Sequence, residues 1–309
     1  MSGAAPAIVY LAGSARSGST IVANVLGQGE GVFAAGELRY LWTRGHLENR
    51  RCGCGDHFTE CAFWQQVQQA ITNERPDLDP GDLERRIRRA TRMRTVPSAI
   101  WRASAFDRRA TRLGEDLAVV YHAIASVSGA QVIIDSSKLP TYGAVLARMP
   151  GVRFEAVHLV RDPRATAFSW AQRKAQPDRD GWMQQFPAWK SGLLWIVWNA
   201  STRPILRRRG VRARPLRYED LAAAPRHSLE RIAQGVGIDP DGLPFIDDRA
   251  VLLVGSHSVA GNGNRMQTGV VVLETDDRWR RQMPSRERRI VTAMAFPWLR
   301  RYHYRVVAS

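Results

Sequence analysis

The sequence predicts an α/β fold in which a parallel sheet is flanked by helices, with a helical insertion after the first strand–helix unit. Two observations lead to this expectation. Apolar segments of strand length occur at residues 7–12, 131–134 and 154–160, and stretches of helical pattern lie between them. Apolar strands that alternate with helices are typical of parallel sheets. We expect the 309 residues to form a single domain, 1–309.

The first strand–helix unit begins with Ala7–Ala12 (AIVYLA), a buried strand. The small-residue loop Gly13–Thr20 (GSARSGST) follows it, and Ile21–Leu26 continues as a helix. In such a unit the loop amides and the helix N-terminus present N–H donors and partial positive charge to an anion. The unit therefore predicts a phosphate-binding loop.

The segment from about residue 40 to residue 128 is interpreted as an arginine-rich, helical insertion or lid. We expect 45–60 to be irregular, because glycine and cysteine are frequent there, and 81–126 to be largely helical with a break near Pro97.

Two later strands run into polar residues. Gln131–Ile134 leads into Asp135-Ser136-Ser137-Lys138, and Phe154–Val160 leads into Arg161. Asp162 as N-cap and Pro163 at the first helical position predict a helix over 165–174. Open α/β sheets bind ligands at the carboxyl ends of their strands, so Arg161 is expected at a ligand site.

The remaining chain predicts a long helix over 190–209, a fourth strand over 213–218 and a tail, 256–283, that is largely loop. No apolar run has the length of a membrane span, and the first residues lack the pattern of a secretory signal. We therefore expect a cytoplasmic protein.

The composition favours anionic ligands. Lysine and arginine total 45 against 29 acidic residues, a formal net charge of +16. Such a charge attracts nucleotides, nucleic acid, anionic lipids or acidic glycans without choosing between them.

The glycine loop has a P-loop-like spacing, Gly13-x4-Gly18-Ser19-Thr20, but Ser19 stands where a P-loop has its lysine. Arg16-Ser17-Gly18-Ser19-Thr20 instead resembles the 5′-phosphosulfate loop of the sulfotransferase superfamily, in the style of its carbohydrate and tyrosyl-protein branches. The resemblance implies 3′-phosphoadenosine 5′-phosphosulfate (PAPS) as donor. It places the donor's 5′ end on Ser14, Arg16, Ser17, Gly18, Ser19 and Thr20.

His158–Ala165 and the following Ser169 resemble the 3′-phosphate site of the same superfamily, where an arginine at a strand end and a serine eight residues later hold the phosphate. Ser169 lies about two helical turns beyond Arg161, so both side chains can reach one phosphate. The segment His257–Arg265 (HSVAGNGNR) resembles, more loosely, the loop that closes over the nucleotide, with Asn262, Asn264 and Arg265 as candidate donors. A flexible surface loop is the alternative.

Sulfuryl transfer requires in-line positioning, charge stabilisation and a base for the acceptor proton. The resemblance implies Glu37, in Ala35-Gly36-Glu37-Leu38, as the base. Lys138 and Arg16 are candidates for stabilising charge on the sulfate. A surface carboxylate and a solvated lysine are the alternative interpretations of Glu37 and Lys138, and His257 is a rival base.

The implied acceptor is a small molecule, lipid or glycan. Adenosine 3′,5′-bisphosphate would be the second product, and no metal is required. Peripheral membrane contact remains open, and a nucleic-acid partner is not expected.

Three cysteines, Cys52, Cys54 and Cys61, lie close to His57, so four soft ligands fall within ten residues. Zinc is conceivable there. The spacing is tighter than in common zinc sites, which favours a structural knuckle or a redox-labile pair.

Two other functions stay open at this point. A P-loop kinase using ATP and magnesium predicts an acidic residue after an apolar strand, which Asp135 satisfies, and a loop lysine, which is missing. A nucleic-acid-binding module would use the arginine run from Arg85 to Arg94 and bind in a salt-dependent way. It leaves the two spaced nucleotide motifs unexplained.

Overall fold

The central element is a parallel sheet with the strand order β2-β3-β1-β4-β5. In the computed structural model, which describes residues 5–306 except 102, 177 and 180, each neighbouring pair of these strands is parallel. The strands are β1 (Ala7–Gly13), β2 (Val32–Gly36), β3 (Val132–Lys138), β4 (Arg153–Val160) and β5 (Arg214–Arg217). The sheet and its helices confirm the predicted α/β class.

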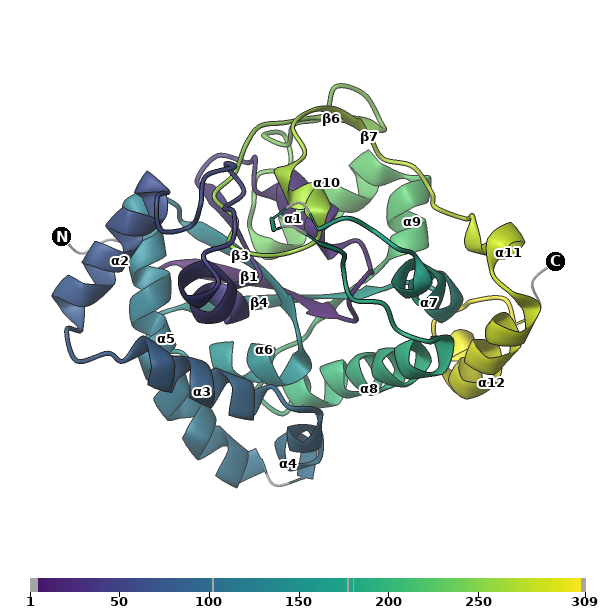
Figure 1. Ribbon diagram of the computed structural model, residues 1–309, viewed down its shortest axis with the longest axis horizontal. Coiled ribbons are helices and arrows are strands. Elements are labelled where there is room, and N and C mark those ends of the chain that lie inside the picture. The colour runs from purple at the N-terminus through teal and green to yellow at the C-terminus, as the bar shows by residue number, and fades with distance from the viewer. Residues whose placement is uncertain (1–4, 102, 177, 180, 307–309) are drawn as a thin grey trace.

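Helices cover both faces of the sheet. Figure 1 shows α5, α6 and α8 on one side and α1, α9 and α10 on the other. The helices are α1 (Ser19–Leu26), α2 (Ala62–Glu74), α3 (Pro80–Ala90), α4 (Val96–Trp101), α5 (Ala103–Ser128), α6 (Pro140–Leu146), α7 (Pro163–Ala171), α8 (Ala188–Arg207), α9 (Tyr218–Ala223), α10 (Pro225–Val236), α11 (Trp279–Gln282) and α12 (Ser285–Arg301). Short helical turns occur at Leu38–Tyr40, Leu41–Leu47, Met93–Thr95 and Gly263–Met266, and an antiparallel pair is formed by β6 (Ala250–Leu253) and β7 (Gly269–Val272).

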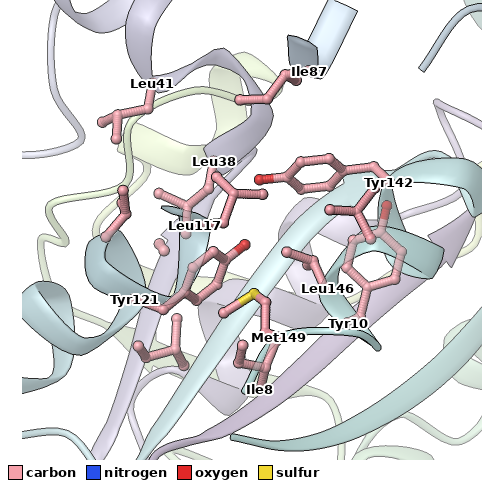
Figure 2. Packing of buried hydrophobic residues seen from close by; sticks show 14 of the residues in the cluster. Ile8, Tyr10, Leu38, Leu41, Ile87, Leu117, Tyr121, Tyr142, Leu146 and Met149 are labelled. Atoms are coloured by element: carbon pink, nitrogen blue, oxygen red, sulfur yellow. The ribbon is translucent and has the colours of Figure 1, made fainter. Parts of the chain in front are cut away.

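Strand β1 divides its side chains between two cores, because successive residues of a strand point to opposite faces. Ile8 and Tyr10 pack with side chains of α5 and α6 in the larger core, which Figure 2 shows from close by. Val9 and Leu11 pack on the other face with α1 and α10. Burial on both faces explains why every residue of β1 is apolar or glycine.

The structure departs from the sequence-based expectation in several elements. The sequence did not predict helix α2, strand β2 or the antiparallel pair β6–β7. Three of the five residues of β2 (VFAAG) are alanine or glycine, so its strand pattern is weak. The irregular segment expected over 45–60 begins in a helical turn that reaches Leu47. The break expected near Pro97 lies just before α4, because proline is tolerated in a first helical turn.

Strand β3 extends past the predicted 131–134 to Lys138, because its polar residues find partners inside the protein. Asp135 is fully buried, accepts a hydrogen bond from the backbone N–H of Ser137 at 2.7 Å and contacts the hydroxyl of Tyr121. Burial raises the pKa of Asp135 to about 6.

This raised pKa predicts a pH-dependent stability. The protonated form of Asp135 is favoured in the folded state, so its contribution is present below the usual aspartate pKa and is lost as pH rises through about 6. Between about pH 4 and pH values above about 6, the free energy of unfolding of wild type should fall by on the order of 3 kcal/mol relative to that of Asp135→Asn, whose side chain does not titrate. Urea unfolding of both proteins at a series of pH values measures the difference. Parallel stability curves would contradict the assignment.

Candidate functional site

A cavity of about 750 Å³ opens at the carboxyl edge of the sheet. Residues that follow β1, β2 and β4 and the last residues of β3 line it. The end of α7, the segment between α7 and α8, part of α8 and the tail loop also contribute to the lining. Of the residues implied for donor binding and catalysis, those that line the cavity are Arg16, Gly18, Ser19, Thr20, Glu37, Lys138, Arg161, Ser169 and Asn264.

The loop after β1 is held in shape by backbone conformations that few residues adopt. Gly18, the N-cap of α1, has φ of 91°, and a Cβ there would lie 2.7 Å from the ring of Tyr218. Arg16 has φ of 66° although it is not glycine. Such strain gathers at functional sites. No side chain caps α1 at Gly18, and its first turn carries no acidic residue, which leaves the helix N-terminus to an anion.

The Arg16 side chain reaches across the cavity. Its guanidinium donates to the side-chain oxygen of Asn262 at 3.1 Å and lies 4.9 Å from the ring centroid of Trp170. Ser14 and Ser17 of the same loop are also implied for the donor. Both are buried and are not among the cavity residues. Neither of their hydroxyls has a hydrogen-bond partner in the described part of the chain.

Arg161 follows β4 directly, and its guanidinium enters the cavity. It donates to the backbone oxygen of Arg16 at 3.3 Å, contacts Asp276 at 3.4 Å and lies over the ring of Tyr218 at 4.3 Å. The neighbouring Asp162 instead caps α7 and pairs with Arg164 at 2.7 Å. Within the described residues, Arg161 therefore pairs with Asp276 and not with its sequence neighbour Asp162.

Ser169 lies on α7, about two turns beyond Arg161, and shares the cavity with it. The ammonium of Lys174 lies 3.5 Å from the Ser169 hydroxyl. Burial, together with nearby positive charges such as Arg16, lowers the pKa of Lys174. An anion placed between Ser169 and Arg161 would therefore also meet a lysine.

Glu37 follows β2, and Lys138 is the last residue of β3. The two side chains form an ion pair at the cavity, with 2.6 Å between Lys138 Nζ and Glu37 Oε1. Lys138 has φ of 71° and also donates to the backbone oxygen of Ser136 at 2.9 Å. Burial acts to raise the pKa of Glu37, but the charges of Lys138, Arg44 and Arg39 outweigh it and hold that pKa below its usual value. Burial lowers the pKa of Lys138. Glu37 is therefore a carboxylate at neutral pH.

Of the three tail-loop residues implied for the donor, two line the cavity and one does not. Asn262 and Asn264 line the cavity, and the backbone oxygen of Asn264 accepts from Asn24 at 3.0 Å. Arg265 is buried elsewhere: it donates to the backbone oxygen of Ser258 at 2.8 Å and pairs with Asp178 at 3.6 Å. In this structure Arg265 braces the loop and does not line the cavity.

The rival base His257 is not among the cavity residues, and neither is the strand histidine His158. His158 is fully buried in β4 against Asn199, and burial lowers its pKa to about 4. His257 lies among the cysteines, with its Nδ1 3.3 Å from the Cys61 sulfur.

Several cavity residues carry no sequence signal that singled them out. Among them are Arg39 and Arg44, which follow Glu37 and whose guanidinium groups lie 3.7 and 3.8 Å from the centre of the Tyr40 ring. Among the described residues, nine basic residues line the cavity, against the two acidic residues Glu37 and Asp276. The basic residues are Arg16, Arg39, Arg44, Arg50, Lys138, Arg161, Lys174, Arg179 and Arg278. This excess of positive charge fits a ligand with several negative charges.

The fold and this basic cavity agree with a match to a known family. The chain belongs to the sulfotransferase family, whose model matches residues 6–241. Its activity is therefore the transfer of a sulfuryl group.

Among solved structures, the chain is similar to the sulfotransferase domain from the Synechococcus PCC 7002 olefin synthase, with 20% identity, a TM-score of 0.47 and 96% of each chain covered. No curated protein matches the sequence. Within the described residues, no helix combines the length and apolar character needed to cross a membrane.

Proposed function

We propose that this sulfotransferase moves the sulfuryl group of PAPS to a hydroxyl or similar nucleophile of a small-molecule, lipid or glycan acceptor. One observation carries the proposal. The loop at Arg16–Thr20 and the pair Arg161 and Ser169, which are far apart in the sequence, line the same cavity as Glu37 and Lys138.

Donor binding follows from the two anion sites. The N-terminus of α1 and Arg16 suit the 5′-phosphosulfate, and Arg161, Ser169 and Lys174 suit the 3′-phosphate. The basic side chains supply the positive charge, so the proposed chemistry requires no metal ion.

The transfer itself is assigned to Glu37 and Lys138. The acceptor oxygen attacks sulfur, the bond from sulfur to the 5′-phosphate oxygen breaks, and Glu37 takes the acceptor proton. The ammonium of Lys138 has three N–H donors, and Glu37 and Ser136 engage two of them. The third can donate to a sulfate oxygen and stabilise the charge that develops there.

The acceptor is proposed to enter beside the segment 40–128, which supplies Tyr40, Arg44 and Arg50 to the cavity. Leu194 and Trp198 of α8 add apolar surface at the same cavity. This mixture suits a hydroxyl compound with both an apolar and an anionic part.

The kinase alternative loses its supporting residue. Asp135 is fully buried, engaged by Tyr121 and Ser137 and not among the cavity residues, so it is not placed to hold a magnesium ion for a nucleotide there.

The nucleic-acid alternative is weakened by α3. Arg85 pairs with Asp79 and Asp82, and Arg86 pairs with Asp82 and Asp116. This part of the arginine run is therefore a salt-bridged helix face.

Calorimetric titration of the protein with adenosine 3′,5′-bisphosphate, and separately with ATP and magnesium, tests the proposal. We expect the bisphosphate to bind without metal and more tightly than ATP, because only the bisphosphate carries a 3′-phosphate for Arg161. Magnesium-dependent ATP binding with no bisphosphate binding would overturn the proposed donor.

A further inference from the structure

Three cysteines and one histidine converge outside the cavity, from two segments far apart in the chain. Cys52, Cys54 and Cys61 come from the loop before α2 and from its N-cap, and His257 comes from the tail loop. The three sulfur atoms and a ring nitrogen of His257 all lie within 4.8 Å of one another. None of the four residues lines the cavity.

Three of the separations between these atoms are close to those of a tetrahedral zinc site. A zinc ion bound at about 2.3 Å from sulfur and about 2.0–2.1 Å from nitrogen places two sulfurs about 3.8 Å apart, and sulfur about 3.6 Å from nitrogen. The sulfurs of Cys54 and Cys61 are 3.8 Å apart. The Nδ1 of His257 lies 3.3 Å from the Cys61 sulfur and 3.9 Å from the Cys52 sulfur.

We propose that Cys52, Cys54, Cys61 and His257 bind one zinc ion. Three thiolates and one imidazole are a common structural zinc set, and four protein ligands leave no open position for water or substrate. The proposed ion therefore has a structural role, and it is separate from the sulfuryl-transfer chemistry.

The structure selects His257 over the histidine that the sequence pattern suggested. His57 lies within the cysteine segment, but its Nδ1 is 2.9 Å from the backbone oxygen of Asn49. His257 is oriented by its own surroundings: Phe63 stacks on its ring at 5.0 Å, and its backbone oxygen accepts from the indole of Trp64 at 2.9 Å. The stacking restricts the imidazole ring, and the hydrogen bond holds the backbone of His257 next to the cysteine segment.

The site would anchor the tail loop. Beyond His257, the backbone oxygen of Ser258 accepts from Gly53 at 3.0 Å, and that of Ala260 accepts from the backbone N–H of Glu37 at 2.9 Å. Two residues further on, Asn262 accepts from Arg16. A metal ion at His257 thus fixes one end of a tail-loop segment whose hydrogen bonds continue to Asn262 at the cavity. Its effect on donor binding rests on the proposed function, whereas the metal site itself does not.

A disulfide is the competing use of the cysteines. Its sulfur atoms must approach to about 2.05 Å, well below the 3.8 Å between Cys54 and Cys61. It would also leave His257 without a role.

The first experiment measures zinc by elemental analysis in protein purified under reducing conditions without chelator, for wild type, His257→Ala and His57→Ala. These two variants form a matched pair, because both remove a histidine near the cysteines and only one removes a proposed ligand. We expect about one zinc per chain in wild type and His57→Ala. In His257→Ala the zinc content per chain should be at least about tenfold lower.

A second measurement, made first on wild type, does not depend on how the variants fold. Cobalt(II) added to chelator-treated wild type should give the visible bands of a tetrahedral site and a thiolate-to-cobalt charge-transfer band, and zinc should abolish both. Cys54→Ser, which changes the exposed ligand, should weaken the charge-transfer band.

The outcomes are distinct. Zinc that is absent from wild type, with no cobalt spectrum, overturns the site. So does zinc that persists in His257→Ala but is lost in His57→Ala, or a Cys54–Cys61 disulfide found by mass spectrometry in reduced, metal-supplied protein.

Trypsin digestion provides the readout for the tail loop. Chelator-treated protein should be cut in the segment around His257–Arg265 faster than zinc-loaded protein, whether or not bisphosphate binds. If zinc binds but the bisphosphate does not, the metal site stands and the proposed donor falls.

Discussion

Replacing Glu37 with glutamine is expected to lower PAPS turnover by about 10²- to 10⁴-fold, the usual contribution of a general base. Glutamine keeps the size of the side chain and can still accept the hydrogen bond of Lys138, but it cannot take the acceptor proton. Bisphosphate affinity should change little, because Glu37 is assigned to the acceptor proton and not to either phosphate. Release of adenosine 3′,5′-bisphosphate, with an acceptor found in a panel of hydroxyl compounds, measures turnover.

The exposed Glu30 supplies the control, since Glu30→Gln removes the same charge away from the cavity. Full turnover in Glu37→Gln would remove Glu37 from the mechanism.

The pH profile provides a signature of the Glu37–Lys138 pair. Lys138 and the neighbouring arginines hold the pKa of Glu37 low, so turnover in wild type should fall only below the usual pKa of a glutamate. In Lys138→Met the positive charge nearest to Glu37 is gone while its burial remains, so the acid limb should move to higher pH. An acid limb at the same pH in both proteins would contradict a base paired with Lys138.

Replacing Arg161 with alanine is expected to weaken adenosine 3′,5′-bisphosphate binding by about 10- to 150-fold. Charge-assisted hydrogen bonds contribute about 1.5–3 kcal/mol, and each 1.4 kcal/mol is a tenfold change in affinity. Adenosine 5′-monophosphate lacks the 3′-phosphate, so the same substitution should barely change its affinity. Calorimetry with both ligands measures the two effects.

The comparison of ligands separates recognition from damage to the loop, because Arg161 also donates to the backbone oxygen of Arg16. An equal loss for both ligands would mean that Arg161 only supports the 5′ loop. Arg226→Ala serves as the charge control, since Arg226 is exposed on α10 and pairs with Glu230. Ser169→Ala should repeat the ligand-specific pattern with a smaller loss, that of a single neutral hydrogen bond.

The parts of the candidate site that the sequence predicts are short segments of consecutive residues. The run from Ala7 to Thr20 contains a buried strand and a glycine loop, and Arg161-Asp162-Pro163 contains a strand end and a helix start. Strand burial, the glycine turn and the cap each depend on neighbours along the chain. For that reason the α/β class and the places of β1, α1, β4 and α7 follow from local pattern.

The pairing of Glu37 with Lys138 has a different origin. The two residues are 101 positions apart, and they meet because β2 and β3 are adjacent in the sheet and end at the same edge. Likewise, His257 replaces His57 beside the cysteines because the tail loop packs against Gly53 and Trp64. The sequence by itself determined the fold class and the two motifs that we propose as anion sites, through short-range propensities. Only the tertiary structure decided which distant charges and ligands meet, because that depends on strand order and long-range packing that no local pattern contains.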